Sequence, residues 1–101
     1  MSKLFTPNQA GTVTISVTST SGNTALPTSG GGSLLLTNLG TNKCFIKITS
    51  DSAATASATA DMPILAGGAL LISCGDATRI AHICAATETA TLYVTRGVGG
   101  I

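Results

Sequence analysis

The chain is short of charged residues, aromatic rings and histidine. Charged residues make up 9% of its 101 residues, and it contains no tryptophan, one tyrosine, two phenylalanines and one histidine. An ordinary protein carries roughly 25% charged residues. The hydrophobic fraction is an ordinary 44%, so threonine, serine, alanine and glycine replace the missing charges. A surface of such small, neutral side chains neither repels copies of itself nor loses much side-chain entropy on contact, which suits burial in an assembly.

The scarcity of charge and rings argues against a nucleic-acid partner. The formal net charge is +1, and the five basic residues are scattered among four acidic ones. Binding to phosphates needs a basic stripe that displaces counterions, and none is present. Three aromatic rings also provide little for base stacking. Low net charge with an ordinary hydrophobic fraction argues against disorder in the middle of the chain as well.

Long apolar runs are missing too. No run approaches the roughly 18 residues of a membrane span, and the start, MSKLFTPNQAG, lacks the apolar stretch of a signal peptide. We therefore expect no membrane partner, and synthesis and folding in the cytoplasm. The three cysteines, Cys44, Cys74 and Cys84, form an odd set without paired short spacing, which argues against a disulfide framework and favours reduced thiols.

The segments that are present are of β type. From Thr12, TVTISVT alternates apolar and polar residues as a half-buried strand requires. Residues 19–32 indicate a long connection, with a short extended piece at Ala25 and Leu26. Paired β-rich runs around small or polar turns predict three hairpins, at 33–49, 62–73 and 79–95.

The count and spacing of these segments predict the fold class. The Ala/Ser/Thr stretch 51–61 has no apolar stripe to dock a helix, so it is predicted to be a loop. About seven strands then follow at intervals of roughly 8 to 12 residues, which predicts an all-β protein, a single small antiparallel β-sandwich of jelly-roll or Ig-like type. We expect an extended N-terminal arm at 1–11, the β-sandwich domain at 12–96 and a C-terminal tail at 97–101. Because many inward candidates are alanine or cysteine, the isolated subunit should be marginally stable, and association would add burial.

Few residues are candidates for chemistry. His82 and Cys84 share one face of a predicted strand, but a Cys/His nucleophile pair usually comes from separate elements, so a structural position is favoured. Cys44 and Cys74 would complete the ligand types of a zinc site, but the close Cys-x₂₋₄-Cys spacing is missing and small buried core residues are the preferred interpretation. We therefore predict no catalytic, cofactor or metal site.

The remaining polar and glycine-rich motifs indicate turns. Asp51 and Asp61 bracket the predicted loop, and the flanking residues supply no further oxygen ligands in a known pattern. The glycine clusters SGGGS, LAGGA and RGVGG lack the GK[ST] ending and following helix of a phosphate loop. These motifs therefore predict connections rather than binding sites.

The order of segments along the chain resembles that of a known group. GNTALP precedes a strand ending in TNLGTNKCFIKIT, followed by ATADMPILAGG and then ATRIAHICAATETATLYVTRGVGG. This succession resembles small β-sandwich virion proteins of tailed bacteriophages, and residues 61–63 and 91–97 carry the most specific pieces. This chain departs from the pattern at Lys43 and Cys44, two positions at which small residues are more familiar. Its glycine stretch at 30–32 is also longer than in the pattern.

The resemblance implies a structural role on the phage head. It implies a capsid decoration, or cement, protein that binds the outside of the major capsid protein shell, commonly as a homotrimer, with no catalytic residues. The protein would be made in the host cytoplasm and located on the capsid surface of the virion. The arm and tail carry apolar anchors beside glycine or proline and are the expected partner-binding segments. The residues concerned are Leu4, Phe5, Pro7, Val98 and Ile101.

Other functions fit the same fold class. A tail, neck or head-fibre component would use a β-sandwich equally well. A carbohydrate-binding β-sandwich module is a further alternative, although sugar platforms normally need exposed rings and the chain has only Phe5, Phe45 and Tyr93. An enzyme is not expected. His82 is the one plausible catalyst, and a structural position is favoured for it.

Overall fold

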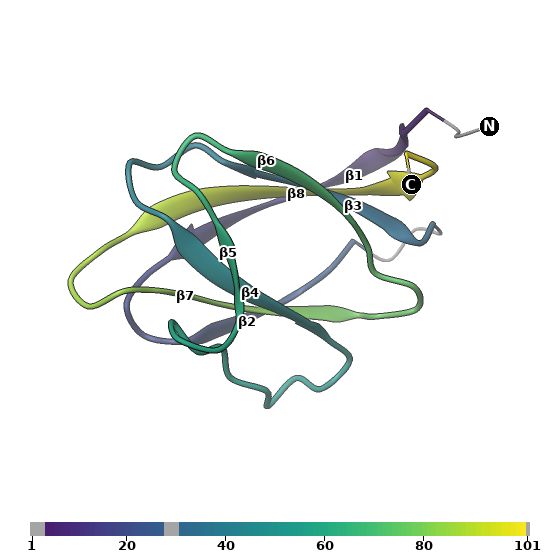
Figure 1. Cartoon of the computed structure of the whole chain (residues 1–101). Coiled ribbons are helices and arrows are strands. Elements are labelled where there is room, and N and C mark those ends of the chain that lie inside the picture. The colour runs from purple at the N-terminus through teal and green to yellow at the C-terminus, as the bar shows by residue number, and fades with distance from the viewer. Residues whose placement is uncertain (1–3, 28–30, 101) are drawn as a thin grey trace.

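Eight strands make up the regular structure of residues 4–27 and 31–100, which the computed structural model describes (Figure 1). In chain order they are β1 (Thr6–Val17), β2 (Gly22–Ala25), β3 (Ser33–Asn38), β4 (Cys44–Thr49), β5 (Met62–Ile64), β6 (Ala69–Ser73), β7 (Arg79–Cys84) and β8 (Ala90–Val98). They form two antiparallel four-stranded sheets. The predicted all-β antiparallel sandwich is therefore confirmed. The described residues include no helix able to span a membrane.

The strand order is that of a jelly roll. Sheet A has the order β1-β8-β3-β6 and sheet B the order β2-β7-β4-β5. Among the eight described strands, β4 and β5 are the one consecutive pair that lies in the same sheet, and every other connection crosses from one sheet to the other. This interleaving of two Greek keys is the jelly-roll topology, one of the two architectures that the sequence predicted.

The three predicted hairpins are wrong. β3 and β4, β5 and β6, and β7 and β8 lie in different sheets and do not pair with each other. A short polar connection between two β-rich runs shows that the chain reverses, but it reverses equally when it crosses the roughly 10 Å between two packed sheets. The antiparallel neighbours β4 and β5 are instead separated by the loop predicted at 51–61.

The predicted boundaries of the sandwich also differ from the structure. β1 begins at Thr6 rather than Thr12, because Thr6 and Pro7 pair with Val98 and Gly97 of β8. An irregularity in the register between Pro7 and Thr12 separates this short piece from the alternating part of the strand. Residues 6–11 of the predicted arm and 97–98 of the predicted tail thus belong to sheet A.

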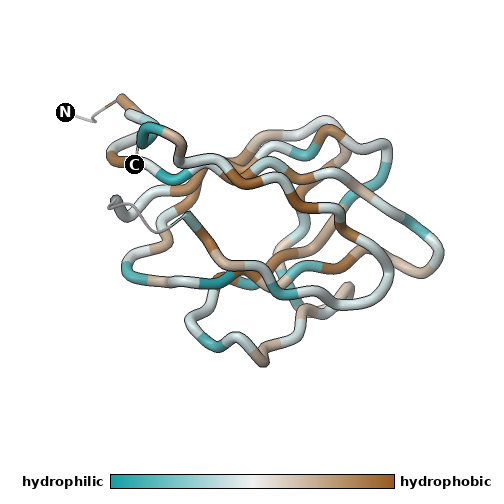
Figure 2. The backbone as a smooth tube through the Cα atoms, turned by 180° about the vertical axis from the view of Figure 1, so that it is seen from behind, coloured by the Kyte–Doolittle hydropathy of each residue, from teal (hydrophilic) through white to brown (hydrophobic). Residues whose placement is uncertain are grey.

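The core lies between the two sheets and is built by strict alternation. Sheet A contributes every second residue of its strands, with Val17, Leu34, Leu36, Leu92 and Val94 fully buried. Sheet B contributes Ile80, Ile46, Cys44 and Cys84 in the same way. Figure 2 shows the apolar segments interleaved with polar ones along the strands, as this pattern requires. No aromatic ring belongs to this cluster of described residues, so the core consists mainly of aliphatic side chains and thiols.

Candidate functional site

The outward side of sheet A is an uncharged surface that spans all four strands, and we call it the open face. Alternation and strand register place on it Thr12, Thr14, Ser16, Ser33, Leu35, Thr37, Ala69, Leu71, Ser73, Thr91, Tyr93, Thr95 and Gly97. None of these residues carries a charge at neutral pH. The eight charged residues within the described ranges lie in loops, on sheet B or in the interior: Lys43, Lys47, Asp51, Asp61, Asp76, Arg79, Glu88 and Arg96.

Two rows of paired residues cross the open face. One row runs from Thr12 through Thr95 and Leu35 to Leu71, and the Thr12 and Thr95 hydroxyls lie 2.7 Å apart in a hydrogen bond. The neighbouring row includes Tyr93, which is 37% exposed. The face therefore combines short hydroxyl groups with apolar side chains. Because none of these side chains is charged, covering the face strips no charged group of its hydration.

The two terminal segments pack onto one end of this face. A methyl group on Gly97 would collide with the carbonyl oxygen of Thr6 and lie 2.9 Å from ring atoms of Phe5, so the Phe5 ring lies directly over Gly97. Gly100 lies against Leu71 and Phe5 in the same way. The Ser33 hydroxyl donates to the carbonyl oxygen of Gly99 at 2.8 Å. Residues 97–100 and Phe5 thus form a small apolar cover at the margin of the open face.

The structure brings three of the five predicted partner-binding residues together, Phe5, Pro7 and Val98. Phe5 lies on Gly97, Pro7 pairs with Gly97, and Val98 pairs with Thr6. Leu4 is 90% exposed and Val98 is 50% exposed. Ile101 falls outside the described residues. The predicted arm and tail therefore meet each other at one end of sheet A, instead of reaching out separately.

Arg96 anchors the end of β8 from the inward side of sheet A. It is buried, and its guanidinium group donates to the carbonyl oxygens of Gly31 and Pro27 at 2.8 and 3.2 Å. It also donates to those of Ala77 and Gly75, both at 2.9 Å. One side chain thus ties the β2–β3 and β6–β7 connections to the strand whose last residues pair with the N-terminal segment. This role was not predicted from the sequence, in which Arg96 is one of five scattered basic residues.

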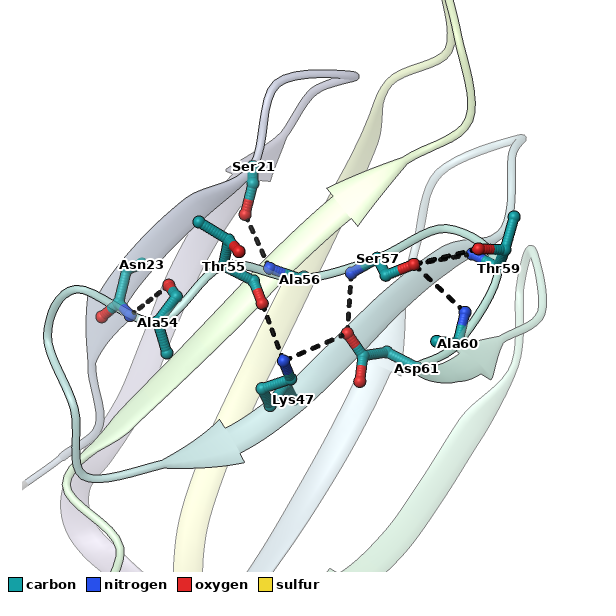
Figure 3. Close-up of polar contacts among 10 residues, drawn as sticks. All are labelled: Ser21, Asn23, Lys47, Ala54, Thr55, Ala56, Ser57, Thr59, Ala60 and Asp61. Carbon is teal, nitrogen blue, oxygen red and sulfur yellow. Dashed lines mark hydrogen bonds and ion pairs between the residues drawn. The ribbon is translucent and has the colours of Figure 1, made fainter.

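The outward side of sheet B is covered by the chain itself. The β4–β5 connection, residues 50–61, is tied to it through its middle, residues 54–56, and through Asp61 (Figure 3). The Asn23 side-chain amide donates to the carbonyl of Ala54 at 3.0 Å, and the Ser21 hydroxyl accepts from the backbone of Ala56 at 2.8 Å. The Lys47 ammonium group donates to the carbonyl of Thr55 at 2.9 Å. Sheet B is therefore lined on its outward side by a tethered loop, whereas in the described part of the chain sheet A is covered only at one end, by the terminal segments.

The two predicted loop carboxylates have local roles in this cover. Asp61 accepts a hydrogen bond from the backbone of Ser57 at 2.7 Å and lies 3.8 Å from the Lys47 ammonium group. Asp51 accepts from the backbone of Ala53 at 2.9 Å. Both carboxylates thus stabilise turns of the loop, in line with the connection predicted from the sequence.

The histidine and cysteine candidates are core residues. His82 and Cys84 both point inward from β7, at 5% and 1% exposure. His82 Nε2 lies 2.9 Å from the Thr24 hydroxyl, Nδ1 has no hydrogen-bond partner among the described residues, and burial lowers the pKa of the ring. Cys74 lies at the edge of the core on the sheet A side. Within the described parts of the chain, no three His, Cys, Asp or Glu side chains gather around one point where an ion could bind.

Comparison with known proteins adds no relative. No family model matches the chain, and no curated protein matches it. The fold and the open face must therefore carry the functional argument.

The open face was missed by sequence reasoning, although a signal for it exists. Leu34, Leu35 and Leu36 form one apolar run, and Leu70, Leu71 and Ile72 form another. In an antiparallel sheet with one buried side, the middle residue of such a run must point away from the core. Leu35 and Leu71 do so, and they are paired with each other across β3 and β6.

Proposed function

We propose that this protein is a structural virion protein of a tailed bacteriophage, a capsid decoration protein that binds the outside of the major capsid protein shell as a homotrimer. In this proposal the open face and the terminal segments beside it form the attachment surface. The sequence resemblance to small phage virion proteins supports it, as does a jelly-roll topology, which is common among viral capsid domains. The proposal rests on the site more than on the fold, because one fold serves many functions.

The observation that carries the proposal is the contrast between the two sheets. Sheet B has its outward side tethered under residues 50–61, whereas sheet A presents a neutral surface of threonine, leucine and tyrosine. Covering charged side chains costs several kcal/mol per unpaired ion, and this surface has none to cover. A protein that must lie flat against a shell gains most from such a face.

The size of the face agrees with attachment as a trimer. Strands lie about 4.8 Å apart and rise about 3.4 Å per residue, so four strands of about five residues cover roughly 300 Å². A standard interface buries about 800 Å² on each partner. One open face is too small alone, but three copies side by side, with the terminal segments, reach that size.

The alternative functions find less support. Tyr93 is the one aromatic side chain with substantial exposure, since Phe45 is buried and Phe5 lies on Gly97. A sugar-binding platform built on a single ring would be weak. A tail or neck component would present the same surface, and the location of the protein on the particle separates the two.

Quantifying the protein in purified particles tests the proposal. Particles released by the cells that encode this chain should contain it at a fixed ratio to the major capsid protein, and cryo-electron microscopy should place it over the whole head. A handful of copies confined to the neck or tail would reject the decoration role in favour of the alternative. Complete absence from particles would reject both.

A pair of charge variants tests the surface. Thr14→Lys adds one charge at an exposed position of the open face, and Ser52→Lys adds the same charge at an exposed position of the β4–β5 connection. Thr14→Lys should lower the affinity for undecorated heads at least tenfold, and Ser52→Lys should leave it unchanged. Equal affinity of the two variants would show that the open face does not meet the shell.

A further inference from the structure

Two of the three cysteines face each other across adjacent strands. The register of β4 and β7 sets Cys44 directly opposite Cys84. Both side chains point into the core, and they are 0% and 1% exposed. The two thiols are free, and they lie far apart in the sequence. The fold therefore creates a dithiol pair that no short spacing in the sequence announces.

The hydrogen-bond pattern shows which kind of cross-strand pair this is. The backbone N–H of Cys84 donates to the carbonyl oxygen of Thr18 at 2.8 Å, on the side of β7 away from β4. In an antiparallel ladder, the N–H and C=O of one residue point to the same side, so Cys44 and Cys84 form a non-hydrogen-bonded pair. Such pairs have the closer Cα spacing, about 4.5 Å, which lies within the range of Cα spacings that a disulfide bond spans.

A polar atom lies near each of the two sulfur atoms. Asn38 Nδ2 lies 3.8 Å from Cys44 Sγ, and Cys84 Sγ lies 3.9 Å from the carbonyl oxygen of Val17. Burial, and to a lesser extent the neighbouring Cys84, raises the pKa of the Cys44 thiol to about 11. Both thiols are therefore protonated at neutral pH in the folded chain, and they react when local opening of the strand pair exposes them to an oxidant.

We propose that Cys44 and Cys84 form a reversible disulfide site, oxidised by a small-molecule disulfide of the glutathione type after the protein leaves the reducing cytoplasm. One thiol loses its proton and attacks the small disulfide, forming a mixed disulfide and releasing one small thiol. The second cysteine then attacks the protein sulfur of that mixed disulfide and releases the second small thiol. The two cysteines are oxidised, the small disulfide is reduced to two thiols, and each proton lost by a cysteine is taken up by a leaving thiolate.

The consequence for the fold is a covalent tie between the two central strands of sheet B. The bond closes a loop of about 40 residues, which stabilises the folded chain mainly by restricting the unfolded one. A subunit with an aliphatic core and no tryptophan gains more from such a tie than a protein with a large core. The site is independent of the proposed shell attachment, because both sulfur atoms lie inside the sandwich.

Oxidation of the purified full-length protein with oxidised glutathione tests the proposal. The product should be lighter by two hydrogen atoms, should keep one free thiol after denaturation, and should yield a crosslinked peptide joining Cys44 to Cys84. Its melting temperature should rise by about 5 °C or more and return to the starting value with a reducing agent. The Cys74→Ser variant is the matched control, because Cys74 has no cysteine opposite it, and it should oxidise with the same mass change and leave no free thiol.

Three outcomes would overturn the proposal. One is a crosslink that involves Cys74, and another is glutathione that remains attached to a single cysteine. The third is three unchanged thiols in the folded protein under conditions that oxidise the unfolded chain. Peptide mapping and thiol counting of the wild type, beside Cys74→Ser, decide among these outcomes without substitution of either core cysteine, so loss of folding in a Cys44 variant does not affect the test.

Discussion

Replacing Arg96 with methionine tests whether one side chain holds the end of sheet A that carries the terminal segments. Arg96 is 7% exposed, and its guanidinium group donates to four backbone carbonyls at 2.8 to 3.2 Å. Methionine retains much of the buried volume but has no donor. All four carbonyl oxygens, in two separate connections, therefore lose their side-chain partner in the Arg96→Met variant.

The expected cost follows from these four bonds. A bond to a charged group contributes about 1.5 to 3 kcal/mol, and part of this is offset in the native protein by the cost of burying the charge. Because the connections lie at the end of the sandwich, water can reach some of the carbonyls in the variant. Counting two unsatisfied carbonyls at about 1.5 kcal/mol each gives a loss of about 3 kcal/mol. A domain of this size is stable by roughly 5 to 10 kcal/mol, so the variant should fold but with much less margin.

Urea unfolding at neutral pH measures this loss. Arg79→Met is the matched control, because Arg79 is half-buried and its hydrogen bonds within the described residues all go to Asn23, at 2.7 and 3.3 Å. We expect Arg79→Met to lose less than about 1 kcal/mol, as is usual for partly exposed polar contacts. Arg96→Lys should fall between wild type and Arg96→Met, since an ammonium group keeps the charge but has three donors. A loss below about 1 kcal/mol in Arg96→Met, or equal losses in both methionine variants, would refute the role given to Arg96.

Three further predictions concern Gly97, His82 and Cys44. Gly97→Ala should lower stability by more than about 1 kcal/mol, because its methyl group would collide with the Thr6 carbonyl and the Phe5 ring, and it should unpair the terminal segments in hydrogen exchange. Burial lowers the pKa of His82, so the unfolded chain takes up a proton first as the pH falls; stability should decrease below about pH 6.5, and a His82→Gln variant should show a flatter pH profile in urea unfolding. Burial raises the pKa of Cys44 to about 11, so its contribution is complete below about pH 8.5 and is lost as the pH rises toward 11; urea midpoints of wild type and Cys44→Ala should converge over that range.

The sequence predicts the strands of this fold better than their partners. The alternation of apolar and polar residues from Thr12 to Val17 predicts a strand with one buried and one exposed side. The structure confirms this, with Ile15 and Val17 of β1 in the core. Pairing is different, because short connections reverse the chain whether the next strand joins the same sheet or the opposite one. The connection 39–43 between β3 and β4 is an example, since it carries hairpin-type residues and nevertheless crosses between sheets.

Sequence reasoning singled out the terminal segments that lie beside the open face, but it did not single out the sheet surface. Phe5 and Val98 stand out in sequence because they are apolar residues beside glycine and proline in segments with no core pattern. The open face depends on strands from both ends and the middle of the chain, β1, β8, β3 and β6, lying side by side. Its neutrality is a property of that arrangement. Only knowledge of the strand order shows that every charged residue of the described chain falls elsewhere.

The distribution of charge gives the proposed attachment a direction. Lys47 and Asp61 lie on or beside the outward side of sheet B and are held there by bonds to the tethered loop 50–61. Charged groups lose least when they stay in water, and a neutral sheet loses least when it is covered. If the open face meets the shell, the β4–β5 connection faces the solvent, and the terminal segments lie at the contact margin. A shell-bound subunit would thus show loop 50–61 outermost, and a map with this loop against the capsid surface would contradict the proposed orientation.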